Sequence, residues 1–168
     1  MKTKKYFFLL LLFIHLLACN DKQTYNQIID QRSGQEILVG RVDKNVFLQQ
    51  PYSKWFNSQY EQYSPNLKIF NNKKLPDFDL TIVLGTWCRD SRLEVPRMFK
   101  ILDSLKIKQN KITIYCVDRN KKALHYNIEN LNIKRVPTFI FYIDGQEIGR
   151  IVEHPIKSLE EDMYEILF

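Results

Sequence analysis

The stretch TWCRDS, residues 86–91, joins a short apolar run to a segment with helical periodicity. The run before it, LTIVLG (80–85), predicts a buried strand, and residues 88–105 predict a helix. A cysteine in the first turn of a helix meets unpaired backbone N–H groups and the positive end of the helix dipole, which favour thiolate over thiol. Cys88 is therefore the candidate nucleophile of this chain.

The segments that follow alternate between strand and helix patterns. Ser91 and Glu94 have the spacing of a capping box, as do Ser158 and Glu161 at the start of a final helix. The expected elements are a strand in KITIYCVD (111–118), a helix in NKKALHYNIENL (120–131), and strands in TFIFYI (138–143) and EIGRIVE (147–153) joined by a hairpin at Asp144-Gly145. This order predicts an α/β fold with a mixed sheet.

Several of these features together resemble the thioredoxin superfamily. Trp87 and Cys88 lie where a strand meets a helix, Pro96 follows eight residues later, and NIKRVPTFIFYIDGQ (132–146) is similar to the segment around that family's cis-proline. The resemblance covers roughly residues 79–167. It implies a thioredoxin-like α/β fold with a mixed central sheet flanked by helices, and a cis peptide bond between Val136 and Pro137 beside the thiol.

The chain departs from the family pattern at two positions. Ser91 stands where a dithiol site has its second cysteine, and Ile82 stands where many thioredoxins carry a buried acid. A CxxS site with one thiol completes turnover only with an external thiol, with the substrate's own second thiol, or with Cys116. Cys116 is otherwise an inert core cysteine. Ser91 could donate a hydrogen bond to the Cys88 thiolate or cap the helix.

Charged residues surround the candidate nucleophile in the sequence. Arg89 follows Cys88 directly, and Arg135 should approach from the cis-proline loop if the fold is right. Lys134 and Arg92 add further positive charge, and Asp90 opposes them. We expect the cations to dominate and to favour the thiolate.

One histidine falls near the expected groove. In the thioredoxin pattern the end of the last strand, here Val152-Glu153-His154, borders the active-site groove. His154 is therefore either a proton shuttle for Cys88 or a surface histidine.

The chain starts with a basic and then apolar segment, MKTKKYFFLLLLFIHLLAC (1–19). The apolar run is too short to span a bilayer comfortably and reads as an export signal. Its end, LLAC (16–19), resembles a bacterial lipobox, which implies that Cys19 is lipidated and becomes the first mature residue. The alternative is an ordinary signal peptide with an incidental cysteine. By this resemblance the protein is anchored in the cell envelope facing the periplasm, and Asn20 slightly favours the outer membrane.

The expected organisation has four parts: a lipoprotein signal peptide (1–18), a tether (19–34), an N-terminal helical extension (35–78) and a thioredoxin-like domain (79–168). Within the extension, EILVGRV (36–42) predicts a strand and Pro51 opens a helix that Ser64-Pro65 ends. That helix carries aromatic residues at helical spacing on one face. The stripe indicates a core face, with a partner-binding face as the alternative.

Composition narrows the function classes. With 45% hydrophobic residues the chain can bury a core, so global disorder is excluded. The formal charge of +6 includes three lysines of the leader, and without them the charge is about +3, which does not indicate a nucleic-acid partner. The sequence lacks a CxxC or HxxxH pair, so neither a zinc site nor another metal or cofactor is expected.

Two functions remain open. The first is thiol–disulfide exchange through Cys88, of monothiol reductase or isomerase type, on envelope proteins or small thiols. The second is a non-catalytic binding or holding module that uses the cis-proline groove.

Overall fold

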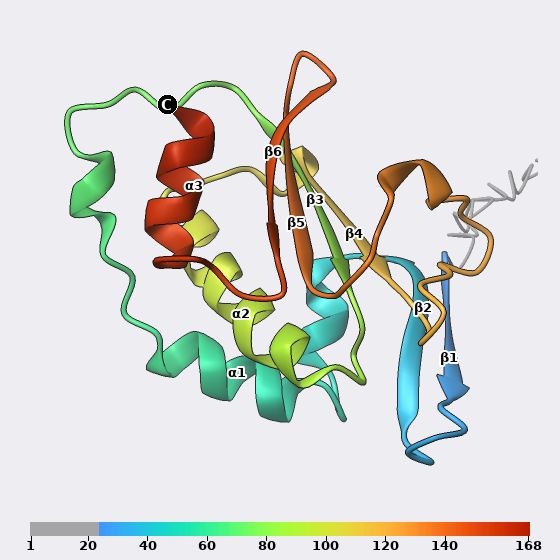
Figure 1. The fold of residues 1–168 in the computed structure, drawn as a ribbon. Coiled ribbons are helices and arrows are strands. Elements are labelled where there is room, and N and C mark those ends of the chain that lie inside the picture. Colours follow the sequence, from blue (N-terminus) through green and yellow to red (C-terminus); the bar gives the residue numbers. More distant parts are fainter. Residues whose placement is uncertain (1–23) are drawn as a thin grey trace, which may run out of the picture.

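The computed structural model describes residues 24–168 (Figure 1). The strands are β1 (Tyr25–Ile29), β2 (Glu36–Val42), β3 (Asp79–Leu84), β4 (Ile112–Cys116), β5 (Thr138–Ile143) and β6 (Gln146–Val152). They form one sheet in the order β1-β2-β4-β3-β5-β6. β3 and β4 are parallel, whereas the other neighbouring strands are antiparallel. The predicted mixed sheet is confirmed, and the fold is a thioredoxin-like α/β fold.

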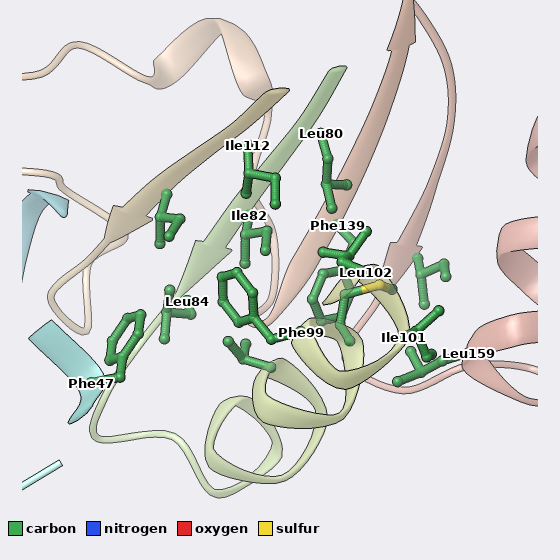
Figure 2. Packing of buried hydrophobic residues seen from close by; sticks show 14 of the residues in the cluster. Phe47, Leu80, Ile82, Leu84, Phe99, Ile101, Leu102, Ile112, Phe139 and Leu159 are labelled. Atoms are coloured by element: carbon green, nitrogen blue, oxygen red, sulfur yellow. The ribbon is translucent and has the colours of Figure 1, made fainter. Parts of the chain in front are cut away.

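Three helices cover one face of this sheet: α1 (Ser53–Gln62), α2 (Arg89–Ser104) and α3 (Leu159–Leu167). Phe56 of α1, Phe99 of α2 and Leu159 of α3 belong to the same buried cluster (Figure 2 shows its centre). Alternate residues of β3 point into that cluster, because successive side chains of a strand face opposite sides. The main core therefore lies between the sheet and the three helices.

The opposite face is covered by the segment 117–137 instead of a helix. The helix predicted over residues 120–131 is wrong: this segment consists of turns and a 3-10 helix at Glu129–Leu131. The Asp118 carboxylate accepts hydrogen bonds from the backbone N–H groups of Asn120 (2.8 Å) and Lys122 (2.9 Å), which holds the chain in a turn. Leu124 has a φ of 51°, outside the helical region.

The N-terminal part contributes more sheet than expected. β2 confirms the strand predicted at 36–42 and pairs with β4, so the segment 35–78 is not only helical. β1 lies inside the predicted tether and pairs with β2 as an outer strand. Gly40 allows this pairing: its φ is 125°, and a Cβ there would lie 2.5 Å from the carbonyl oxygen of Thr24.

Helix α1 confirms the helix predicted after Pro51, and its tyrosines fix it to other elements. Tyr60 donates a hydrogen bond to Asp103 (2.7 Å), and Tyr63 donates one to Glu160 (2.9 Å). Tyr52, which directly precedes the helix, donates to Glu36 (3.0 Å). The tyrosines of the aromatic stripe therefore bind other segments of this chain.

The C-terminal elements follow the sequence prediction. Asp144 and Gly145 both have positive φ, as a two-residue hairpin turn between β5 and β6 requires. Ser158 is the N-cap of α3, and its hydroxyl oxygen accepts a hydrogen bond from the backbone N–H of Glu161 (3.1 Å). The predicted helix start with Ser158 as its cap is confirmed, and the Ser158 hydroxyl donates to the Glu161 carboxylate at 3.0 Å.

Within residues 24–168, no helix is long and apolar enough to cross a membrane. The predicted signal peptide and Cys19 lie outside the described residues.

Candidate functional site

The thiol of Cys88 lies beside the loop that carries the cis-proline. Cys88 is half-buried and is the N-cap residue of α2. Its Sγ donates a hydrogen bond to the carbonyl oxygen of Val136, at 3.2 Å. The peptide bond between Val136 and Pro137 is cis, as the resemblance implied. Two segments 48 residues apart thus meet at one sulfur atom.

The start of α2 supplies the electrostatics expected for a reactive thiol. The helix begins at Arg89, so its first backbone N–H groups lack partners within the helix and give this end a partial positive charge. The Cys88 side chain makes no capping hydrogen bond with the helix N–H groups. Its sulfur therefore lies at the positive end of α2 and is bonded to the cis-proline loop instead of the helix.

Gly85 and Trp87 shape the loop that leads to the thiol. The Trp87 indole N–H donates to the carbonyl oxygen of Val117 (2.9 Å). A Cβ built on Gly85 would lie 2.5 Å from Cε2 of the same indole. The indole therefore packs directly on the glycine backbone, and a larger residue at position 85 would displace it.

Ser91 is fully buried one turn after Cys88. Its hydroxyl oxygen accepts a hydrogen bond from the backbone N–H of Gly85, at 3.2 Å. The capping box predicted for Ser91 and Glu94 is wrong, because the helix has already begun two residues earlier. Glu94 pairs instead with Arg97 at 3.5 Å, and burial raises the pKa of the Glu94 carboxyl. A hydrogen bond from Ser91 to a Cys88 thiolate stays a prediction.

The predicted cations take different positions around the site. Arg89 is exposed at the start of α2, with Asp90 beside it. Arg92 donates to the carbonyl oxygen of Thr86 (2.5 Å) and to the side chain of Gln35 (3.2 Å).

Arg135, in the cis-proline loop, pairs with Glu153 at 2.6 Å, and the neighbouring Lys134 is exposed. Of the three arginines that were expected to favour the thiolate, Arg92 and Arg135 therefore make their hydrogen bonds to other groups.

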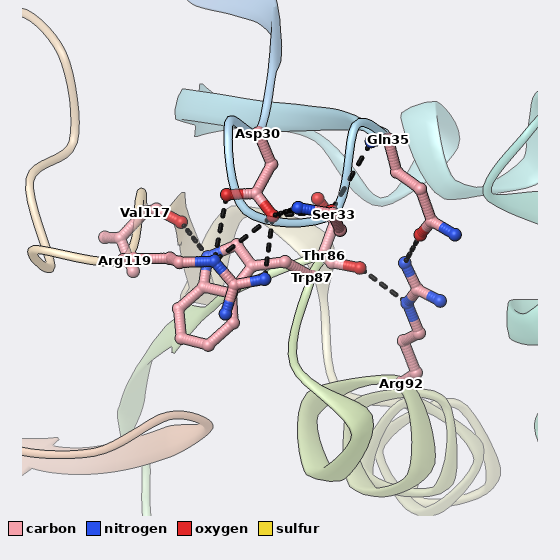
Figure 3. A network of polar contacts seen from close by, with 8 residues as sticks. All are labelled: Asp30, Ser33, Gln35, Thr86, Trp87, Arg92, Val117 and Arg119. Atoms are coloured by element: carbon pink, nitrogen blue, oxygen red, sulfur yellow. Dashed lines mark hydrogen bonds and ion pairs between the residues drawn. The ribbon is translucent and has the colours of Figure 1, made fainter.

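Sequence reasoning missed Arg119, which follows the end of β4. Its guanidinium lies over the Trp87 ring, 4.7 Å from the centroid, and forms an ion pair with Asp30 (2.7 Å) (Figure 3). One signal was available: β3 and β4 are parallel, so residues after β4 come to the same sheet edge as Cys88.

His154 follows the end of β6. It is exposed and lines a cavity of about 600 Å³ together with Arg135, Thr138 and Glu153. Neither Cys88 nor Pro137 lines this cavity, so the place of His154 at the active-site groove stays a prediction. Proton transfer between His154 and Cys88 stays a prediction.

Cys116 is fully buried in β4 and belongs to the core under the helices. Cys88 packs against the separate cluster on the opposite face. Both thiols are free, and burial raises the pKa of the Cys116 thiol well above its usual range. Cys116 is therefore placed as a core residue and not as a partner for Cys88.

Among the residues from 24 to 168, no three His, Cys, Asp or Glu side chains gather where a metal ion could bind.

Comparison with known proteins gives one curated relative in sequence. The chain is 32% identical over 104 residues to a protein named thioredoxin O, mitochondrial, from Oryza sativa subsp. japonica. The match covers 61% of this chain and 56% of the relative, so the chain spans little more than half of that protein. No family model matches the chain.

Solved structures similar to this chain include two thioredoxins. For thioredoxin O2 from Arabidopsis thaliana in the oxidized state, the identity is 23% and the TM-score 0.41, covering 67% of this chain and 87% of that one. For Schistosoma mansoni thioredoxin the identity is 26% and the TM-score 0.38, covering 60% and 86%. A protein of unknown function from Pseudomonas aeruginosa has 15% identity and a TM-score of 0.45, covering 72% and 76%.

Proposed function

We propose that this protein is a thioredoxin-like thiol–disulfide exchange protein that acts through one nucleophilic cysteine, Cys88. The observation that carries the proposal is the position of this thiol. It is half-buried at the start of α2, and its sulfur lies 3.2 Å from the carbonyl oxygen of Val136 beside cis-Pro137. The sequence likeness to a thioredoxin supports the same class of chemistry.

The reaction begins with attack of the Cys88 thiolate on one sulfur of a substrate disulfide. The substrate S–S bond breaks as the bond between Cys88 and the attacked sulfur forms. The other substrate sulfur leaves as a thiolate, which takes a proton from water. The Cys88 sulfur is oxidised to the same extent as the leaving sulfur is reduced.

Release of the substrate needs a second thiol. Ser91 cannot supply one, because its hydroxyl forms no stable bond to sulfur. Cys116 is fully buried in the other hydrophobic cluster. An external small thiol therefore attacks the Cys88 sulfur and frees the substrate sulfur as a thiol, and a second small thiol then releases Cys88 as the small molecule's disulfide forms. Alternatively, the second thiol of the substrate attacks the substrate sulfur bound to Cys88, so that a new substrate disulfide forms and Cys88 leaves as a thiolate. The protein is then a monothiol reductase in the first case and an isomerase in the second.

The proposal includes the bacterial cell envelope as the place of action. The lipobox at residues 16–19 supports lipidation of Cys19 after removal of the signal peptide. Substrates are then disulfide-bearing or thiol-bearing envelope proteins or small thiols, which an oxidising compartment supplies.

The test is to trap the mixed disulfide. Purified full-length protein is mixed with a disulfide-containing peptide, quenched with acid and analysed by peptide mass spectrometry. The wild-type protein should form an adduct at Cys88 that disappears when glutathione is added. Cys88→Ser should form none. Cys116→Ser is the matched control and should trap as much peptide as wild type; if it traps more, Cys116 resolves adducts.

A gain-of-function variant sharpens this test. Cys88 and Ser91 are three residues apart at the helix start, so their side chains lie on the same side of the first turn. Ser91→Cys should resolve the adduct internally, lowering the trapped fraction and raising the reduction of insulin in the presence of dithiothreitol. If neither wild type nor Ser91→Cys forms an adduct, the proposed chemistry is wrong.

The cavity next to the cis-proline loop favours a second candidate, a binding or holding module. Its lining by Arg135, Glu153 and His154 suits an extended peptide with charged side chains. This candidate predicts that Cys88→Ser binds a reduced peptide as tightly as wild type, while no variant exchanges disulfides.

A further inference from the structure

An ion pair connects the N-terminal hairpin to the loop after β4. Asp30 follows β1 directly and is only 6% exposed. Its carboxylate accepts two hydrogen bonds from Nε of Arg119 (2.9 and 3.1 Å) and one from Nη2 (2.7 Å). The hydroxyl and backbone N–H of Ser33 bind the same carboxylate, at 2.5 and 3.1 Å. The guanidinium of Arg119 is thus held in one orientation.

This orientation places the cation over the residue that precedes the thiol. The Arg119 guanidinium carbon lies 4.7 Å from the centre of the Trp87 ring. The edge of the same indole is fixed by its hydrogen bond to Val117 (Figure 3). A residue of the hairpin, 58 positions before Cys88, therefore reaches the neighbour of the thiol through two contacts.

Arg119 and Asp30 also bring two opposite charges close to the residue that precedes the thiol. The pKa of Arg119 is raised, mainly by its hydrogen bonds to Asp30 and to a lesser extent by negative charge at Asp30 and Cys88. The guanidinium holds its positive charge against the indole that precedes Cys88, and the Asp30 carboxylate neutralises part of that charge. The other charged groups around the thiol are Arg89, Asp90 and Arg92 on α2, Asp118 beside Arg119, and Lys134 and Arg135 with its partner Glu153 at the cis-proline loop.

We infer that Arg119 and Asp30 are a pair of positioning residues that set the reactivity of Cys88. Arg119 fixes Trp87 and adds positive charge near the thiol. Asp30 orients Arg119 and neutralises part of its charge. The inference goes beyond thiol–disulfide exchange itself, and it rests on Cys88 being the reacting thiol.

The two members of the pair should act in opposite directions. Asp30→Asn removes the negative charge and leaves the guanidinium uncompensated, so the thiolate becomes more favourable. Arg119→Gln removes the positive charge and leaves a carboxylate nearby, so the thiolate becomes less favourable. A purely structural connection would lower or raise the reactivity in the same direction in both variants.

The experiment measures the rate of Cys88 alkylation by iodoacetamide, located by peptide mass spectrometry in the full-length protein. The pH is fixed where the wild-type rate still rises with pH. Asp30→Asn should raise the rate about 3- to 10-fold, and Arg119→Gln should lower it by about the same factor, as expected for one charge at a partly exposed site. Both differences should shrink at 1 M salt.

Two further variants serve as controls. Lys122→Gln removes an exposed cation from the same loop and should leave the rate within a factor of about two, because exposed charges are screened. Arg119→Lys keeps the charge but loses the bidentate geometry, so it should recover most of the wild-type rate even if Arg119→Gln folds poorly.

Three results overturn the inference. One is an equal rate in all variants, the second is a change of the same sign in Asp30→Asn and Arg119→Gln, and the third is a low rate in Arg119→Lys. A wild-type Cys88 that does not react at all is a different failure, because it rejects the proposed function together with this inference.

Discussion

Gly85 sets how closely the indole of Trp87 can approach the loop before the thiol. The contact that a Cβ would make there is 2.5 Å, shorter than side chains tolerate, and its partner is a rigid ring. Gly149 is also crowded, at 2.9 Å, but its neighbour is the flexible side chain of Ile166. The two glycines therefore differ in what must move when a methyl group is added.

Gly85→Ala should lower the free energy of unfolding by about 1–3 kcal/mol, because the indole or the loop must shift. It should also change the fluorescence of Trp87, measured in a Trp55→Phe background. Gly149→Ala is the matched control and should cost less, since Ile166 can turn aside. Urea unfolding measures both losses, and equal losses would contradict this account.

Sequence reasoning placed some site residues and missed others for a definable reason. Cys88 was predicted from its place where a strand meets a helix, and Pro137 from the resemblance of residues 132–146 to the cis-proline segment of thioredoxins. The contact between Asp30 and Arg119 joins residues 89 positions apart, and neither lies in a recognisable motif. The burial of Ser91 against Gly85 was missed because the spacing to Glu94 suggested a cap that the earlier helix start makes impossible.

Tyrosine hydroxyls in and beside helix α1 hold it in place by donating hydrogen bonds to carboxylates of other segments. Burial, and then the hydrogen bond to Asp103, raises the pKa of Tyr60 to about 12. The pKa values of Tyr52 and Tyr63 are raised further, again mainly by burial. Each tyrosine must therefore stay protonated for the contact to persist.

The protein should lose stability in alkali for this reason. The pKa of an unfolded tyrosine is about 10, below that of the folded tyrosines. Their contribution is therefore complete below about pH 10 and is lost as the pH rises through the folded value of Tyr60, about 12. Urea unfolding at a series of pH values should show this fall.

Two variants check the source of the alkaline loss. Tyr60→Phe should make the dependence on pH between 10 and 12 less steep. Tyr63→Phe should also cost about 1–3 kcal/mol at neutral pH, because it removes one hydrogen bond from the buried Glu160. A slope unchanged in both variants would contradict the role of these tyrosines.

Among the elements, strong periodicity or a turn signal predicted β3, α2, the hairpin and α3. The helix expected at 120–131 failed because Asp118 binds the backbone N–H groups that a helix would have used. β1 was missed because YNQII is mostly exposed and pairs on one side only, so its residues lack the pattern of a buried strand.

For the whole molecule, the proposed lipidation of Cys19 makes a direct prediction about location. Mature protein should partition into membranes and incorporate labelled palmitate, and Cys19→Ala should abolish both. Cys116→Ser is the control and should keep the label, because that thiol is buried in the core. A soluble product cleaved at another position would contradict the anchor.

One face of the sheet is covered by three helices and the other by a segment without a long helix, so the two faces should differ in how easily they open. The main core lies between the sheet and the three helices, whereas the segment 117–137 closes the opposite face by packing Val117, Ala123, Ile128 and Val136 with Val83 of β3. A segment with few buried apolar contacts detaches at a lower free energy than the whole protein unfolds. The segment 117–137, against which Cys88 packs, can therefore change its conformation to fit differently shaped partners while the three helices stay packed on the sheet.

Hydrogen exchange in native protein would reveal this local opening. The hydrogen-bonded amides of Tyr126 and Leu131 should exchange at a lower free energy that barely depends on urea. The amide of Ile114, in the centre of the sheet, should follow global unfolding and depend steeply on urea. If all three amides share one urea dependence, the segment 117–137 opens only when the whole protein unfolds. Cys88 then packs against a rigid segment.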